Sequence, residues 1–439
     1  MKATALRNLL LATGGAILSS AVAAATWEMV VPAAAGLLDE NGRLVNSAGA
    51  PKSDRSGAPL TPKCVVPQVG PFRFFVQAGD PDRLLVYHSG GGACWNAATC
   101  ASGLGLLAGV APTYSPAIFE TPDSLAVAGG VLSPDSAANP FANWTKVYLP
   151  YCTGDVGWGN RDVVYSLPQS NGPAVPLPIS HRGYANIRTV TEWLGRRFAP
   201  PNVPPKHVVV AGSSAGGYAA IGTLFAETVG VVGRSADISV IGDSANGIVN
   251  DAFLQSARQV WGFDATLPDP VLSAVDQGAD GLPVRVYSNQ AQWHRGARFG
   301  QYQNAYDLVQ ARVFNVMKHP EQPALWNDPL AIGAALVEWT VKARSSVIAT
   351  ALNPAYRFYT AAGYEHVVLQ DIGLEAGLGF CSDNLATEVS GQTLRGPVPF
   401  KEWAKDMATR SGLNLFTDDW RNATCWPNCN VAPRCPLPF

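Results

Sequence analysis

A serine flanked by glycines lies where a β-branched strand gives way to a helical pattern. The run GSSAGG (residues 212–217) follows the strand predicted over residues 207–211. This G-x-S-x-G spacing is typical of a nucleophile at a sharp strand-to-helix turn, where free helix amides favour negative charge. We therefore predict Ser214 as a catalytic nucleophile. A Gly-rich structural turn is the alternative, because the chain holds 43 glycines.

A second Gly-rich segment, HSGGGACW (residues 88–95), ends an earlier predicted strand. In hydrolases with a nucleophile elbow, one oxyanion amide comes from the residue after the serine and another from an earlier strand end. The order predicts Ala215 as one donor, and Gly91, Gly92 or Ala93 as the other. A phosphate loop is disfavoured, because the segment has no G-K-[ST] motif and no neighbouring basic residue.

The base should follow the nucleophile in the chain, which leaves His294, His319 and His366. His366 lies in the loop after the strand predicted over residues 356–360, where a catalytic histidine belongs. We therefore predict His366 as the base.

Two aspartates could orient the imidazole. Asp243 directly follows the strand predicted over residues 238–241, and Asp307 lies nearer to His366 in the chain. The residue pattern alone does not choose between them.

The elements needed to position these groups alternate along the chain. Apolar and β-branched runs predict strands, and three-to-four-residue apolar spacing predicts helices. Such alternation indicates an α/β-hydrolase fold, with a mainly parallel sheet, helices on both faces and inserted roofing helices. We expect no internal repeat, and a loop over residues 50–68. Strands are predicted over residues 72–77, 83–88, 146–152, 207–211, 238–241, within 282–304 and over 356–360, and helices over 185–198 and 218–228.

The composition describes an apolar, weakly charged chain of 439 residues. Hydrophobic residues make up 47% and charged residues 15%, and the net charge is −2. Such a chain can bury a large core, and its charge argues against nucleic acid as a partner. We expect a signal peptide over residues 1–25 and a single domain over 26–439, with a Cys-rich tail from about residue 380. No later segment is expected to span a membrane, and the protein is expected to be a monomer.

Eight cysteines in an exported chain indicate disulfides. Cys94 and Cys100 form the best local pair. Zinc is the alternative for Cys425, Cys429 and Cys435, although no histidine lies near them. The eight are Cys64, Cys94, Cys100, Cys152, Cys381, Cys425, Cys429 and Cys435.

Six motifs in order give the chain a resemblance to the pectin acetylesterase family, which includes the animal carboxylesterase Notum, and most to its bacterial branch. The matching runs are GGGACW (90–95), NPF (139–141) with PYCTGD (150–155), GYAN (183–186), GSSAGG (212–217), AYDLVQ (305–310) and GYEH (363–366). The resemblance covers roughly residues 70–370. It implies Asp307, rather than Asp243, as the acid. Segments 245–280 and 320–350 and the tail match nothing recognisable.

The resemblance and the motifs together predict a secreted serine carboxylesterase that needs no metal and no organic cofactor. Its expected substrate is an acyl ester, such as acetyl on an extracellular polysaccharide. On simple aryl esters, we expect kcat/KM to be highest for acyl groups of two to four carbons. Trp95 and Trp158, in motif loops, are candidate sugar-binding residues or simply core residues. The alternatives are a lipid or polyester esterase with residues 320–350 as a lid, and a non-catalytic binding module.

Overall fold

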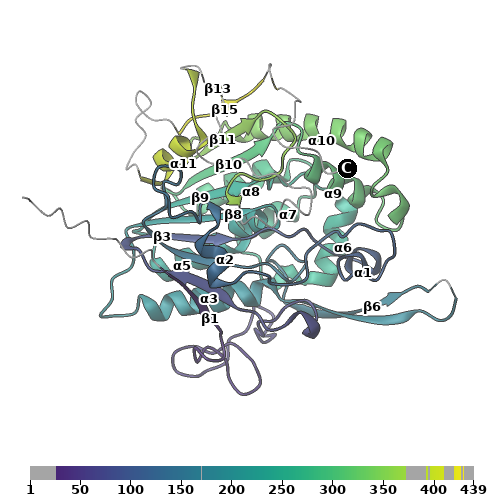
Figure 1. Ribbon diagram of the computed structural model, residues 1–439, viewed down its shortest axis with the longest axis horizontal. Coiled ribbons are helices and arrows are strands. Elements are labelled where there is room, and N and C mark those ends of the chain that lie inside the picture. Colours follow the sequence, from purple (N-terminus) through teal and green to yellow (C-terminus); the bar gives the residue numbers. More distant parts are fainter. Residues whose placement is uncertain are drawn as a thin grey trace, which may run out of the picture.

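The computed structural model describes residues 26–169, 171–371, 392–393, 396–409, 420–426 and 429. The described residues include a sheet of eleven strands (Figure 1). The strands from β5 and β3 to β15 pair in parallel, and those at both edges pair antiparallel. In spatial order they are β1 (Trp27–Val30), β2 (Phe74–Gln77), β5 (Trp144–Leu149), β3 (Asp80–His88), β8 (His207–Ser213), β9 (Asp237–Asp243), β10 (Arg298–Asn304), β11 (Tyr356–Ala361), β15 (Ala423–Thr424), β13 (Gln392–Thr393) and β14 (Gly396–Pro397).

Helices cover both faces of the sheet, as the alternation predicted. On β10, Phe299 packs against Tyr287 of α8, while a Cβ on the next residue, Gly300, would touch Trp403 and Met407 of α11. Successive strand residues point to opposite faces, so α8 and α11 lie on opposite sides. The α-helices are α1 (Ala97–Gly103), α2 (Pro122–Ala126), α3 (Gly183–Arg197), α4 (Ala215–Ala219), α5 (Phe225–Val232), α6 (Asp251–Trp261), α7 (Asp269–Val275), α8 (Leu282–Trp293), α9 (Leu308–Lys318), α10 (Pro329–Thr350) and α11 (Phe400–Thr409).

The expected strands and helices are all present within a few residues of their predicted bounds. The strand expected within residues 282–304 occupies only its last part, because residues 282–293 form α8. A π-helix, Ala220–Leu224, joins α4 to α5. This helical run, Ala215–Val232, is long and apolar enough to cross a membrane, contrary to expectation, but 72% of it is buried in the protein. It is therefore the core helix that follows the elbow.

Three hairpins of the same geometry follow β1. Their turns begin at Asp39, Asn46 and Asp54, whose side-chain oxygens accept the N–H groups two and four residues later. The backbone N–H groups of Leu44, Lys52 and Leu60 donate to the carbonyls of Leu60, Leu44 and Lys52, so three bonds close a ring. The expectation of no internal repeat is therefore wrong. The repeat is set by turn residues rather than by hydrophobic periodicity, so apolar patterning does not reveal it.

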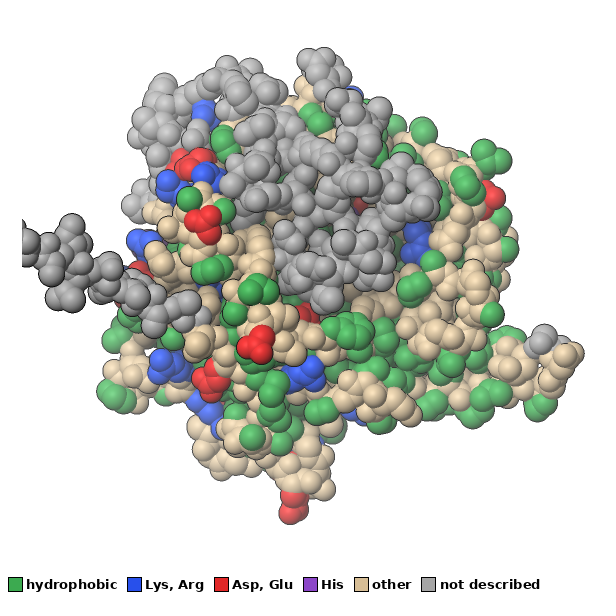
Figure 2. Space-filling view, viewed as in Figure 1, with side chains coloured by type: hydrophobic (Ala, Val, Ile, Leu, Met, Phe, Trp, Pro, Cys, Tyr) green, Lys and Arg blue, Asp and Glu red, His purple; other side chains and the backbone are tan. Residues whose placement is uncertain are grey.

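Two smaller elements lie outside the main sheet. The antiparallel ribbon of β6 (Arg161–Leu167) and β7 (Val175–His181) extends from the body of the molecule (Figure 1), and β4 (Gly129–Gly130) pairs with β12 (Gln370–Asp371). On the face shown in Figure 2, charged side chains are scattered among hydrophobic ones rather than gathered into a patch. This surface agrees with the low charge content.

The described cysteines form three disulfides: Cys64–Cys152, Cys94–Cys100 and Cys425–Cys429. The predicted pair Cys94–Cys100 is confirmed. The zinc alternative is disfavoured, because Cys425 and Cys429 bond each other. The signal peptide, Cys381, Cys435 and most of the tail lie outside the described residues.

Candidate active site

Ser214 occupies a strained elbow between β8 and α4. Its backbone has φ 54° and ψ −121°, a conformation that non-glycine residues adopt only where the surroundings enforce it. The Ser214 N–H donates to the Asp243 carbonyl at 2.7 Å. A Cβ on Gly212 would collide with the Gly216 carbonyl, and one on Gly216 with the His88 carbonyl. The two glycines of the motif are therefore required by close backbone packing.

Ala215 begins α4, where helix N–H groups have no acceptor within the helix. Gly92 lies across the same pocket in the left-handed region, with φ 75°. Among the described residues, neither the Ala215 nor the Gly92 N–H has a hydrogen-bond acceptor. Both amides can therefore donate to a bound group, and their role as oxyanion donors stays a prediction.

The other two oxyanion candidates fit less well. The Ala93 N–H donates to the Thr113 carbonyl at 3.0 Å, so the prediction of Ala93 as a donor is not supported. Gly91 does not line the pocket that holds Ser214, and a Cβ there would collide with the Tyr151 ring. Of the three candidates, Gly92 is therefore the one that lines the pocket with an N–H that has no acceptor among the described residues.

His366 and Asp307 form a buried pair. His366 Nδ1 lies 2.8 Å from Asp307 Oδ2 and 3.0 Å from Oδ1. Asp307 also caps α9, because its Oδ1 accepts the Gln310 N–H at 2.9 Å. His366 and Ser214 line the same pocket. The structure thus places the predicted serine, acid and base beyond the carboxyl ends of the parallel strands β8, β10 and β11, respectively.

Asp243, the alternative acid, binds other groups. Its carboxylate accepts the Ser213 hydroxyl at 2.6 Å and the N–H groups of Val368 and Leu369 at 3.0 and 2.9 Å. Burial raises the pKa of Asp243 to about 6. Asp243 therefore anchors the loop that carries His366. Of the other histidines, His294 packs against Phe225 and His319 caps the end of α9, and neither lines the pocket.

The pocket beside Ser214 is almost entirely apolar. Its walls come from the Trp158 loop, the elbow helix, α6, α8, α9 and Trp339 of α10. Segment 245–280, which matched no motif, thus supplies a substantial part of the wall, whereas segment 320–350 supplies Trp339. Its apolar lining residues are Ala93, Val156, Trp158, Ala215, Ile221, Ala245, Ile248, Val249, Phe253, Leu254, Trp261, Leu282, Pro283, Val286, Tyr287, Val309, Val313, Phe314, Met317 and Trp339.

The two candidate sugar-binding tryptophans have different places. Trp158 lines the pocket and its Nε1 donates to the Tyr218 carbonyl at 3.1 Å, beside the π-helix. Trp95 is 3% exposed, packs edge-to-face on Phe253 and does not line the pocket. Neither ring is exposed as a sugar platform would need, so the structure favours the core interpretation for Trp95.

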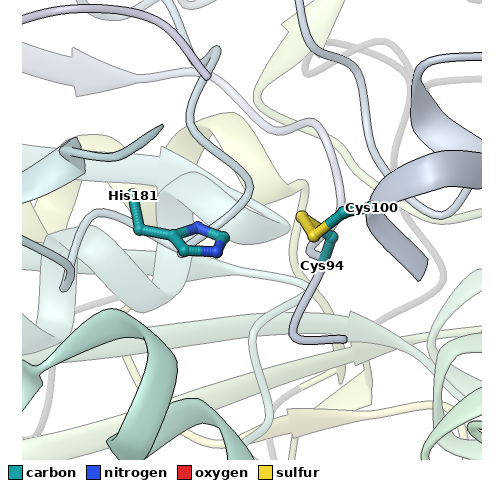
Figure 3. A group of neighbouring side chains, drawn as sticks. All are labelled: Cys94, Cys100 and His181. Carbon is teal, nitrogen blue, oxygen red and sulfur yellow. A yellow bond between two sulfur atoms is a disulfide. The ribbon is translucent and has the colours of Figure 1, made fainter. Parts of the chain in front are cut away.

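A cysteine and histidine cluster beside the oxyanion segment has ligand-like spacing. The His181 ring faces the Cys94–Cys100 disulfide (Figure 3). The disulfide occupies both sulfur atoms, and the His181 nitrogens lie 3.2 Å from the Thr153 carbonyl and 3.0 Å from the Tyr165 hydroxyl. Burial lowers the pKa of His181 to about 4. The cluster is therefore a buried packing unit rather than a metal centre.

Sequence reasoning assigned no role to the polar groups behind the triad. The Ser244 hydroxyl donates to the His366 carbonyl, and the Gln310 Nε2 donates to Asp307 Oδ2 at 2.9 Å. One signal was present: Asp307-x-x-Gln310 has the spacing of a helix N-cap and its N3 partner.

Comparison with known proteins agrees with the motifs. Residues 74–245 match the pectinacetylesterase family model. No curated protein matches the chain in sequence. The crystal structure of the Wnt deacylase Notum from Drosophila is similar at a TM-score of 0.49 and 16% identity, over 79% of this chain and 87% of that one. This likeness is too weak to carry an argument. The resemblance to the pectinacetylesterase family is therefore confirmed on the segment that holds the oxyanion loop and the nucleophile elbow.

Proposed function

We propose that the protein is a serine carboxylesterase acting through Ser214, His366 and Asp307. The observation that carries the proposal is the meeting of the Ser214 elbow, the His366–Asp307 pair and the Gly92 and Ala215 amides at one pocket. A binding module would have no need of a strained serine opposite two amides and a paired imidazole. The match to an esterase family over residues 74–245 supports the same reaction class.

In the proposed reaction, Ser214 Oγ attacks the ester carbonyl carbon while His366 takes the hydroxyl proton. The Gly92 and Ala215 amides hold the negative oxygen, and His366 then gives its proton to the departing alcohol. Water hydrolyses the acyl-enzyme by the same route. Asp307 fixes the imidazole tautomer. The scheme needs no metal or organic cofactor.

The lining of the pocket favours a hydrophobic acyl group. An acetyl group presents only one methyl group to a pocket, whereas side chains from five helical segments line this pocket. Each buried methylene contributes about 0.8 kcal/mol, so such a wall rewards longer acyl chains. We therefore propose lipid or polyester esters as the first substrate candidate. They rank ahead of the esters of two to four acyl carbons that the sequence analysis predicted.

Acetyl esters on an extracellular polymer are the second candidate. The family description favours them, because residues 74–245 match pectinacetylesterase. The three disulfides fit an oxidising compartment, so we propose an exported enzyme for either substrate. We keep the expectation of a monomer that binds no nucleic acid.

Labelling with a fluorophosphonate tests the reaction class. The probe should react once per chain at Ser214, and Ser214→Ala should abolish labelling and ester hydrolysis. Ser273→Ala, which removes an exposed serine on α7, is the control and should change neither. Full activity of Ser214→Ala would refute the proposal. A series of p-nitrophenyl esters from acetate to laurate then decides between the two substrate candidates.

A further inference from the structure

The last residue of β9 and the segment after it contact Ser214 and His366 directly and reach Asp307 through Gln310. The Asp243 carbonyl accepts the Ser214 N–H, and the Ser244 hydroxyl donates to the His366 carbonyl. The Asn246 N–H donates to Gln310 Oε1 at 3.2 Å, and Gln310 in turn binds Asp307. The strand that could have supplied the acid thus supplies supports for all three groups.

Gln310 has only one workable orientation. Its oxygen faces the Asn246 N–H, and its Nε2 faces Asp307 Oδ2 at 2.9 Å. Turning the carboxamide over would set oxygen against carboxylate and NH₂ against N–H. The Gln310 backbone N–H holds the other carboxylate oxygen at 2.9 Å. Both oxygens that contact His366 are therefore held by Gln310.

The chain of donors continues away from the site. The Tyr356 hydroxyl donates to Gln301 Oε1 at 2.6 Å, and Gln301 Nε2 donates to Asn246 Oδ1 at 2.9 Å. The Asn246 side chain also donates to Gln303 Oε1. These side chains are buried, where aligned hydrogen bonds strengthen one another. The Tyr356 and Gln301 side chains thus donate toward Asn246, whose side-chain NH₂ donates to Gln303 and whose backbone N–H donates to Gln310.

We propose that Gln310 is a positioning residue of the triad: held by Asn246, it fixes the Asp307 carboxylate and tempers the basicity that Asp307 confers on His366. The inference rests on the proposed function, and it deepens it. A donor on Asp307 Oδ2 shares the negative charge that would otherwise stabilise the imidazolium. Without Gln310 Nε2, the carboxylate is freer to rotate and pairs more strongly with protonated His366.

Other titratable groups face this pair. Asp243 lies near His366, Tyr218 lies near Asp307, and Glu365 precedes His366 in the loop. Burial raises the pKa of Tyr218 to about 12, so Tyr218 stays neutral. Asp243 titrates close to an imidazole, but it is the same in the wild type and in a Gln310 variant. A difference between their pH profiles therefore reports Gln310.

The test compares Gln310→Met with Gln290→Met. Gln290 is also a buried helical glutamine whose Nε2 donates to a carbonyl, that of Ile221, but it does not contact the triad. We expect Gln310→Met to lower kcat on a p-nitrophenyl ester by about 10- to 100-fold and to raise the apparent pKa of kcat/KM. Gln290→Met should leave the pH profile unchanged.

Gln310→Glu provides a second variant of nearly the same shape. A second carboxyl group beside Asp307 should shift the acid limb of the pH–activity profile. This shift is expected in the part of the variant protein that folds. Unchanged pH profiles in both variants would overturn the inference, as would a Gln310→Met loss confined to KM, because Gln310 also lines the pocket. Fluorophosphonate labelling of Ser214 in the same samples separates this failure from failure of the proposed function.

Discussion

Both carboxylate oxygens of Asp307 lie within 3.0 Å of His366 Nδ1. Asp307→Asn should leave the fold intact but present an NH₂ group to that nitrogen, which favours the wrong tautomer. We expect a loss of roughly 10⁴ in kcat. Circular dichroism would verify folding, and kinetics would measure the loss.

Asp243→Asn is the matched comparison. It weakens the anchoring of the Val368 and Leu369 amides but leaves Asp307 bound to His366 Nδ1, so a smaller loss, about 10- to 100-fold, is expected. A larger loss for Asp243→Asn than for Asp307→Asn would reverse the assignment of the acid.

Activity should rise with pH as His366 becomes the free base. The rise should centre near the ordinary imidazole value of about 6.5. Asp243, whose pKa burial raises to about 6, loses its proton in the same window. Only its ionised form offers both oxygens as acceptors to the loop amides, so the two titrations act in the same direction. His366→Ala should lose on the order of 10⁴ or more in kcat, and a variant keeping a tenth of the activity would exclude His366.

Gly92 provides a test of the oxyanion segment. A Cβ there would collide with the Thr113 carbonyl at a backbone φ of 75°, so Gly92→Ala must displace the loop. We expect kcat to fall by about 10²- to 10³-fold, the usual cost of one oxyanion donor. Gly105→Ala is the control, because Gly105 has φ 70° and open space around its Cα. Equal activity of the two variants would contradict the role of Gly92.

Val313→Trp should shorten the preferred acyl chain. Val313 is a half-buried residue of α9 that lines the pocket, so an indole there takes space from the acyl group. In the wild type, we expect kcat/KM to rise by about three- to fourfold per methylene between two and about six carbons. The variant should lose that rise.

Val337→Trp makes the same change on the exposed side of α10 and should keep the wild-type preference. A wild-type optimum at acetate would instead favour the polymer acetylesterase candidate.

Two of the disulfides should differ in whether they contribute more to the free energy of unfolding or to kcat. Cys64–Cys152 spans 88 residues and Cys94–Cys100 spans six. Chain entropy then assigns about 4–5 and about 2 kcal/mol to them. Paired Cys→Ala variants should follow that order in urea unfolding, whereas kcat should fall more without Cys94–Cys100, which adjoins the oxyanion segment. The opposite ranking in kcat would argue against that link.

The sequence predicted the parts of the site that depend on local geometry. The elbow requires glycines at fixed positions around Ser214, and His366 is identified by its position in the loop after a strand. Both residues can therefore be predicted from the sequence. Asp307 could be chosen only through a family resemblance, because Asp243 ends the neighbouring strand equally well. Packing decides between them: Val368 and Leu369 reach Asp243, and no local pattern encodes that contact.

The acyl pocket was beyond prediction for a related reason. Helices α6, α8, α9 and α10 are apolar on the sides that meet, but spacing along each does not say whether the meeting surfaces close together or leave a hollow. Turn chemistry was the other gap. The three hairpins after β1 repeat Asp or Asn followed three residues later by Gly, a pattern in turn residues that apolar periodicity does not detect.

The ring of backbone bonds through Leu44, Lys52 and Leu60 makes the hairpins mutually dependent. Each hairpin supplies the acceptor for one neighbour and takes its own from the other, so none has a complete partner set until all three are in place. Lys52 also pairs with Glu192 on α3, which ties the ring to the main body. The amide protons of these three residues should therefore exchange with solvent at one common rate, as a single opening event rather than three.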